Sequence, residues 1–261
     1  MTDTSSSNSE SRIPVARRTV LVAGGATAAA LAVGGAASAG ALDGGISQDN
    51  TAPAAAAVCT LTREMTEGPY YLDGQYVRAD ISEGKPGVPL KLTLTVVDDD
   101  TCAPLRGALV ELWHADALGE YSGFVGANGH SEPDNGTFLR GGVLTNSSGV
   151  ATITSIYPGW YIGRCIHIHV KVHTGVTVTS DGHYTGGREI HTGQLFFNET
   201  VTTRVATVSP YSTNRVTRTT LSRDSIYDGG GAASGLLTLS ALGSTPSAGY
   251  AGTLTLGVET S

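Results

Sequence analysis

The residues best suited to chemistry lie in one stretch, Tyr-Pro-Gly-Trp-Tyr-Ile-Gly-Arg-Cys-Ile-His-Ile-His, residues 157–169. From Ile166 to His173, aliphatic residues alternate with polar ones. A period of two with β-branched residues predicts a strand with one buried face. His167 and His169 would then point the same way, close enough to bind one metal ion.

Tyr161 and Arg164 add a phenol oxygen and a permanent cation to this pair of histidines. A turn at Pro158-Gly159 can swing the phenol back over the imidazoles. The stretch therefore indicates a metal site with nitrogen and oxygen donors. On these residues alone a simpler interpretation stays open, in which both imidazoles are solvated on the polar face of a strand.

Alternation elsewhere in the chain predicts the strands that would support this site. Turn residues such as Asp98-Asp99-Asp100 separate them, and no window of useful length shows strong helical periodicity. The expected strands are 88–96, 108–114, 150–156, 166–173, 194–198 and 201–208. Short strands at regular spacing predict an all-β domain, a single antiparallel β-sandwich.

The N-terminal residues 1–39 have the form of a twin-arginine export signal. Arg17-Arg18 precede an apolar run, residues 20–37, and Ala37-Ser38-Ala39 fits a signal-peptidase site. We therefore expect a secreted bacterial protein with no membrane association after cleavage. The alternative is a membrane anchor, although glycines interrupt the run and it is barely long enough to span a bilayer.

Composition divides the remainder of the chain into three parts. Residues 40–57 consist largely of Ala, Gly, Asp and Pro and predict a disordered linker. Residues 58–228 form the expected folded domain, which has an ordinary single-domain size. The tail, 229–261, is rich in Gly, Ser and Thr, and its partial alternation predicts edge strands or a loosely held segment.

The formal net charge of −7 excludes some classes of partner. Removing residues 1–39 takes away three arginines against two acidic residues, which leaves the mature chain near −8. An acidic surface argues against binding to nucleic acid and to anionic membranes. We therefore expect no nucleic-acid partner.

Three cysteines, Cys59, Cys102 and Cys165, remain to be placed. In an exported protein a pair is expected to form a disulfide. Cys59 with Cys102 is the favoured pair, because both lie next to polar turns outside the histidine stretch. Cys165 shares strand parity with His167 and His169, so it is either a small buried residue or a third ligand in a Cys-x-His-x-His cluster.

Two more strings accompany the histidine stretch. Trp-His-Ala-Asp at 113–116 is followed by Gly-Glu-Tyr-Ser at 119–122, and Glu-Gly-Pro-Tyr-Tyr at 67–71 comes earlier. With the string Tyr-Pro-Gly-x-Tyr-x-x-Arg-x-x-His-x-His, they stand in the order found in the intradiol ring-cleavage dioxygenases. Over about residues 60–228 the chain resembles this family, which includes catechol, hydroxyquinol and protocatechuate dioxygenases.

The resemblance implies one ferric iron, Fe(III), per chain, held by two tyrosinates and two histidines. Matched by motif, the ligands are Tyr121, Tyr161, His167 and His169. Fe(III) is a hard acid, and phenolate oxygen is a hard donor that stabilises it. The implied reaction uses O2 to open a catechol-type ring between its two hydroxyl-bearing carbons. The product is a muconate-type diacid, and no other cofactor is needed.

The resemblance also implies roles for residues around the iron. Tyr161 is the ligand expected to leave the iron and take a proton, Arg164 offsets charge on the ring, and Gln194 is a polar pocket residue. Strand parity alone would put Arg164 on the aliphatic side, so a bulge or turn at Gly163 is required. The expected substrate-side residues are Gly68, Pro69, Tyr70 and Trp160, with Leu72 and Phe124 as further pocket walls.

Two other classes of protein fit parts of the pattern. One is a zinc or copper protein that uses Cys165, His167 and His169. The other is a secreted β-sandwich binding module in which Trp113 and Trp160 stack on sugar. From the sequence we also expect the export signal and linker to stand where cytosolic catechol dioxygenases have an N-terminal helical region. This leaves the oligomeric state open and favours extracellular substrates, such as catechols released from lignin.

Overall fold

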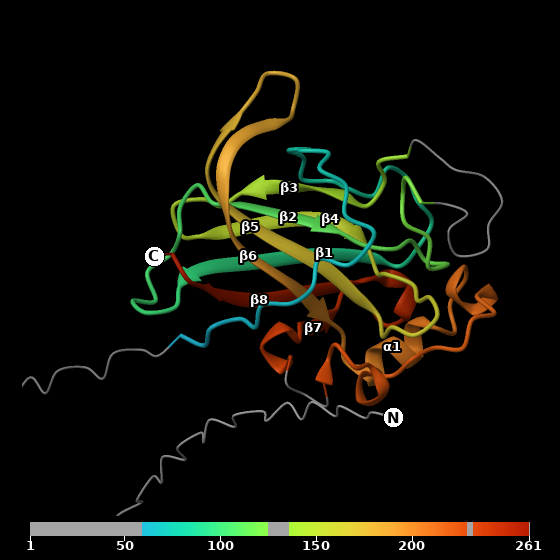
Figure 1. Cartoon of the computed structure of the whole chain (residues 1–261). Coiled ribbons are helices and arrows are strands. Elements are labelled where there is room, and N and C mark those ends of the chain that lie inside the picture. Colours follow the sequence, from blue (N-terminus) through green and yellow to red (C-terminus); the bar gives the residue numbers. More distant parts are fainter. Residues whose placement is uncertain (1–58, 125–135, 229–231, 261) are drawn as a thin grey trace, which may run out of the picture. The chain divides into compact units, whose positions relative to one another are not determined.

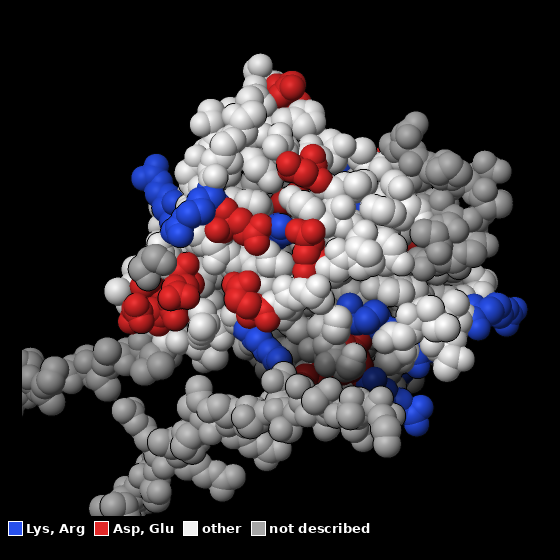
Figure 2. All heavy atoms as spheres, viewed as in Figure 1, with Lys and Arg blue, Asp and Glu red and all other residues white. Residues whose placement is uncertain are grey.

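The computed structural model describes residues 59–124, 136–228 and 232–260, and these build two four-stranded sheets (Figure 1). The predicted export signal, 1–39, and linker, 40–57, lie outside the described residues. Among the residues described, no helix is long and apolar enough to cross a membrane. Figure 2 shows acidic side chains scattered over the face drawn there, in keeping with the net charge of −7.

One sheet has the strand order β4-β1-β8-β7. Its strands are β4 (Val150–Ile156), β1 (Pro89–Asp98), β8 (Tyr250–Val258) and β7 (Thr238–Ala241). The pair β1–β8 is parallel, whereas β1–β4 and β7–β8 are antiparallel. The expectation of a purely antiparallel sandwich is therefore wrong at this pair. Parallel neighbours need a long crossover, which the chain between β1 and β8 provides.

The other sheet is antiparallel throughout and has the order β3-β2-β5-β6. Its strands are β3 (Arg140–Leu144), β2 (Leu109–Trp113), β5 (His167–Val178) and β6 (Tyr184–Phe196). The hairpin of β5 and β6 extends well beyond the rest of the sheet (Figure 1). At its other end, β5 carries the two histidines into the body of the domain.

The core forms from the alternating apolar residues of both sheets. The core residues of β1 and β5, all fully buried, are Leu90, Leu92, Leu94, Val96, Ile168, Val170 and Val172. Burial of each such side chain contributes about 1.5–3 kcal/mol. Because successive strand residues face opposite sides, this packing turns His167, His169 and Lys171 to the other face of the sheet. The predicted division of β5 into an aliphatic and a polar face is therefore confirmed.

The prediction of a strand at residues 201–208, after β6, is wrong. Residues Glu199–Val205 form the helix α1. The side chain of Asn198 caps it by accepting a hydrogen bond from the Thr200 N–H, and Glu199 lies in the first turn, where an acid is favourable. Thr202 and Val205, spaced by one turn, are buried. Capping and packing thus override the β-propensity of a Thr- and Val-rich segment.

Both the N-terminal and the C-terminal parts of the described domain are attached to the sheet that contains β1. The Cys59–Cys102 disulfide is present and links residues 43 positions apart, so the expected pairing is confirmed. On the chain-entropy model, a loop of this length stabilises the fold by roughly 3–4 kcal/mol. The C-terminal segment supplies β8, which lies inside the sheet between β1 and β7 and not at its edge.

Candidate metal and substrate site

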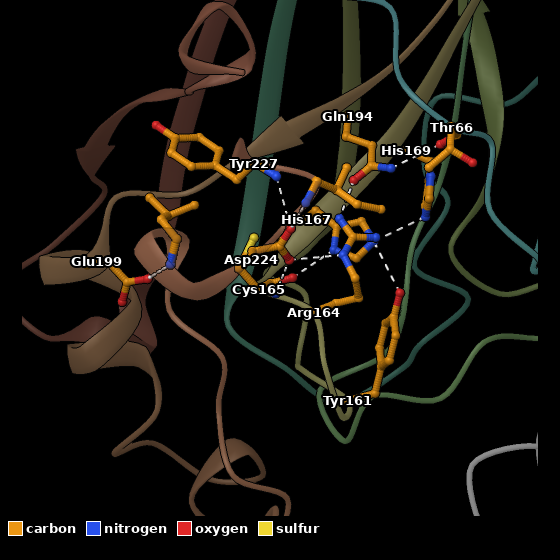
Figure 3. A network of polar contacts seen from close by, with 12 residues as sticks. Thr66, Tyr161, Arg164, Cys165, His167, His169, Gln194, Glu199, Asp224 and Tyr227 are labelled. Carbon is orange, nitrogen blue, oxygen red and sulfur yellow. Dashed lines mark hydrogen bonds and ion pairs between the residues drawn. The ribbon is translucent and has the colours of Figure 1, made fainter. Parts of the chain in front are cut away.

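Four nitrogen and oxygen donor atoms meet at one place beside β5. His167 Nε2 lies 3.1 Å from His169 Nε2 and 3.3 Å from the Tyr161 hydroxyl (Figure 3). The Tyr121 hydroxyl lies 3.4 Å from the same nitrogen. Tyr121, His167 and His169 are almost fully buried, and Tyr161 is partly buried. The four predicted ligands are therefore brought together by the fold.

The two tyrosines reach this point from adjoining loops. Gly119, at φ +90°, lies so close to the other loop that a Cβ there would be 2.3 Å from the Trp160 carbonyl oxygen. Only glycine fits that combination of backbone conformation and contact. Asp116 fixes the turn before Tyr121, because its Oδ1 accepts hydrogen bonds from the Leu118 and Glu120 N–H groups.

Hydrogen bonding sets which nitrogen of His167 is available. Its Nδ1 lies 2.7 Å from the Cys165 carbonyl oxygen, which can only accept, so Nδ1 carries the proton. Nε2 therefore presents a lone pair to the other donors. Burial, aided by the Arg164 charge, lowers the pKa of His167 to about 3, and burial also lowers the pKa of His169. Both imidazoles are neutral, the form that binds a metal.

Burial shifts the pKa of the two phenols in the opposite direction to that of the imidazoles. Burial raises the pKa of Tyr121 and of Tyr161, so both keep their protons unless a cation is present. A metal ion lowers the pKa of its ligands and would convert these groups into phenolates. Two neutral imidazoles with one buried and one partly buried phenol fit a hard, highly charged cation. This donor set is consistent with ferric iron.

Cysteine takes no part in this donor set. Among the residues described, no group of three or more His, Cys, Asp and Glu could hold a metal. Cys165 packs instead with Phe196 and Tyr227, and burial raises the pKa of its thiol. The structure therefore favours the small buried residue over a Cys165 ligand for zinc or copper.

The Arg164 side chain is held over the donors by three contacts (Figure 3). Its Nε donates to Asp224 Oδ2 at 2.9 Å, its Nη2 donates to Gln194 Oε1 at 2.5 Å, and its Nη1 lies 3.4 Å from His167 Nε2. Gly163 has a φ of +85° and β5 begins only at His167. Arg164 thus lies between this turn and the strand and is not part of the strand, as the parity argument required.

Asp224 is a residue that the sequence did not reveal. It is 2% exposed, and besides Arg164 its carboxylate accepts hydrogen bonds from the N–H groups of Cys165, Ile226 and Tyr227. Burial opposes ionisation, but these backbone donors and the Arg164 charge prevail and lower its pKa to about 2. No local pattern marks this residue, because its role depends on a partner 60 positions away.

The predicted substrate-side residues fall into two groups. Gly68 and Tyr70 border the donors: a Cβ on Gly68 would lie 3.3 Å from His169 Cε1, and the Tyr70 ring stacks on Tyr121 at 4.5 Å. Pro69 is exposed between them. Trp160 instead lies in the core, where its Nε1 donates to the Val216 carbonyl.

Other aromatic and apolar residues complete the surroundings. Phe124 packs against Tyr70, Leu72 is 40% exposed, and Trp113 stacks on His169 at 4.7 Å. Because Trp113 and Trp160 are both buried, the structure gives no support to a module that stacks them on sugar. A cavity of about 720 Å³ borders Tyr161 and is otherwise lined by residues 118–120, Ile162 and 213–217. Its size suits a small organic ligand.

The Asp224 carboxylate should stabilise the fold in a pH-dependent way. Its folded pKa, about 2, is below the ordinary value of 3.8, so its contribution is present above that value and is lost as pH falls toward 2. Asp224→Asn should lower the free energy of unfolding by about 2–3 kcal/mol at pH 7 and by roughly half as much at pH 3. Urea denaturation at both pH values measures this.

Asp228→Asn is the matched control, because it removes only an exposed ion pair with Arg63. It should change stability little at either pH. An equal loss at pH 7 and pH 3 in Asp224→Asn would show that the charge of Asp224 is not what stabilises the fold.

Comparison with known proteins agrees with this geometry. Residues 66–174 match a family model described as "Dioxygenase". A catechol 1,2-dioxygenase of Acinetobacter baylyi is 30% identical over 149 residues, which are 50% of this chain. The chain spans only 46% of that relative's length.

Solved structures extend the similarity over most of the chain. An intradiol ring-cleavage dioxygenase from Tetranychus urticae is 31% identical, with a TM-score of 0.66 over 77% of this chain and 95% of its own. The dioxygenase domain of a carbohydrate-binding fusion protein from Streptomyces sp. SirexAA-E is 26% identical, with a TM-score of 0.51 over 77% of this chain and 100% of its own. The chain therefore belongs to the intradiol ring-cleavage dioxygenase family.

Proposed function

We propose that this protein is a non-haem Fe(III)-dependent dioxygenase that uses O2 to cleave catechol-type rings between the two hydroxyl-bearing carbons. The products are muconate-type diacids. One observation carries the proposal: one further imidazole nitrogen and two phenol oxygens lie within 3.4 Å of His167 Nε2, with the Arg164 guanidinium beside them. The names of the relatives support catechol as the class of substrate.

Tyr121, Tyr161, His167 and His169 would hold the metal. When bound, ferric iron supplies the positive charge that ionises the phenols and draws electron density from a chelated catechol. His167 and His169 offer fixed donors because they belong to a strand. Tyr161 lies in a loop, just before a turn, and is less buried than Tyr121, so it is the side chain best placed to move and accept a proton at its phenol oxygen.

Arg164 would stabilise anionic charge on the substrate. Its guanidinium is always charged, and Asp224 and Gln194 fix its direction. A preorganised cation in a buried site stabilises developing charge without reorganising during the reaction. Gln194 in turn donates from Nε2 to the Thr66 carbonyl, which links this cation to the substrate-side loop.

The location of this activity is a further part of the proposal. The paired arginines at 17 and 18 and Ala37-Ser38-Ala39 support export to the outside of a bacterial cell. The Cys59–Cys102 disulfide supports the same location, since such bonds persist in oxidising compartments. We propose extracellular catechols, such as those released from lignin, as substrates.

The first experiment combines metal analysis with the visible absorption spectrum. A tyrosinate–Fe(III) site should give a red-brown protein with one iron per chain, and that protein should convert catechol and O2 into the ring-opened diacid. A colourless zinc protein, or one with no bound metal, would exclude the proposed chemistry. Copper with its own absorption bands would exclude it as well.

The four ligands should not be equivalent. His169→Ala removes a donor held rigidly on β5, so this variant should lose iron or nearly all activity. Tyr161→Phe keeps the other three donors and should retain iron, while its colour changes and its turnover is lost. Iron content, absorption spectrum and kcat measure the difference. Normal turnover in Tyr161→Phe would remove this phenol from the mechanism.

Arg164→Ala should lower kcat by about 10²–10³, or roughly 3–4 kcal/mol, which is typical for the loss of one electrostatic donor. Arg164→Lys should restore activity only partly, because an ammonium lacks the planar fork that contacts Asp224 and Gln194. Iron content should stay near normal. A raised KM with unchanged kcat would instead mean that Arg164 only binds substrate.

A further inference from the structure

A segment of the chain before the first strand runs across the donor cluster and forms one of its walls. We call residues 64–71 the strap. Its start is paired with β6: the Met65 N–H donates to the Thr192 carbonyl, and Glu64 accepts a hydrogen bond from the Thr192 N–H. The Thr66 carbonyl accepts a further bond from Gln194. The strap therefore has a fixed start, but these contacts all precede the residues that face the donors.

The residues that face the donors come next. Gly68, at φ +74°, packs against His169, and the Tyr70 ring stacks on Tyr121 at 4.5 Å and meets the Tyr161 ring edge-on at 5.8 Å. A catechol that reached the donors would have to fit beside this wall. What holds Gly68 and Tyr70 in place therefore bears directly on substrate binding.

Lys171 supplies the ion pair that holds this part of the strap, beside a hydrogen bond from the Tyr71 hydroxyl to Glu111. Its Nζ lies 2.6 Å from Glu67 Oε2, 2.7 Å from Glu189 Oε2 and 4.2 Å from the centre of the Tyr71 ring. The lysine side chain is only 7% exposed. It stands on β5 two positions after His169, on the same face as the histidines. Strand β5 thus supplies both histidine donors and the lysine that forms an ion pair with the strap.

We propose that Lys171 is a positioning residue for the catechol reaction. Through Glu67 it holds Gly68 and Tyr70 against the donor cluster, so that the strap forms a preorganised wall of the substrate site. This inference rests on the proposed function for its kinetic consequence only. Preorganisation lowers the cost of ordering a loop when the substrate binds, so its loss should appear mainly in KM.

The two carboxylates that contact Lys171 provide a matched pair of variants. Glu67 and Glu189 lie at nearly equal distances from the same ammonium, and their side chains are 43% and 42% exposed. Glu67 belongs to the strap, whereas Glu189 belongs to β6. Glu67→Gln and Glu189→Gln each remove one ion pair of similar strength, but only the first carboxylate is part of the strap. Glu189 also accepts a hydrogen bond from the Thr192 hydroxyl, which the amide oxygen of a glutamine can keep, so the strap's start at Thr192 is preserved in this control.

The experiment compares these variants as iron-loaded proteins. Glu67→Gln should raise KM for catechol about threefold to fivefold, as expected for a half-exposed ion pair, with kcat within about twofold of the unaltered protein. Hydrogen exchange of the peptide covering residues 64–71 should become faster. Glu189→Gln should change neither quantity, and Lys171→Arg, which keeps the charge, should stay closer to the unaltered protein than Lys171→Met.

Equal effects of Glu67→Gln and Glu189→Gln on KM and exchange would overturn the proposal, since Lys171 would then be a general stabilising residue. Unchanged KM and exchange in Glu67→Gln would overturn it too. If the unaltered protein does not turn over catechol, the proposed function fails. The exchange comparison needs no substrate and still decides whether Lys171 holds the strap.

Discussion

The burial of four neighbouring donor side chains, Tyr121, Tyr161, His167 and His169, is the constraint on which this site depends. Burial favours the neutral form of every ionisable group, and here it lowers the pKa of His167 and raises that of Tyr121. The protein thereby holds two imidazoles ready to bind a cation and two phenols that ionise only when a cation arrives. A strongly charged metal is the natural complement to such a cluster, because it alone can offset the cost of two buried phenolates.

The β-sandwich supplies this cluster from elements of unequal rigidity. The alternation of β5 places aliphatic side chains in the core and His167 and His169 on the opposite face, so the packing of the core also fixes the imidazoles. Tyr121 and Tyr161 come from loops that meet where Gly119 lies against the Trp160 carbonyl. The site thus combines two donors fixed on a strand with two donors held by loops, which is compatible with the proposed movement of Tyr161.

Local patterns predicted what local physics determines. Alternation predicted β1, β2, β4 and β5, and the spacing of His167 and His169 predicted that they share a face. Residues 201–208 were wrongly predicted as a strand, because Thr and Val favour strands until the Asn198 cap and tertiary packing select a helix. The strand β3 escaped prediction because its Gly141-Gly142 lacks alternation. The pairing of β8 with β1 is a long-range event that no short window can indicate.

The contacts of Arg164 are another long-range feature that the local sequence could not predict. The sequence places a cation three residues before a histidine, but its direction comes from Asp224, Gln194 and the turn at Gly163. An unpaired guanidinium this close to neutral imidazoles would be costly, and Asp224 offsets that cost while leaving one nitrogen directed at His167. The buried acid is therefore what allows a permanent cation to face the site where substrate charge would develop. Its identity could emerge only from the folded chain, because the pair joins segments that are far apart in sequence.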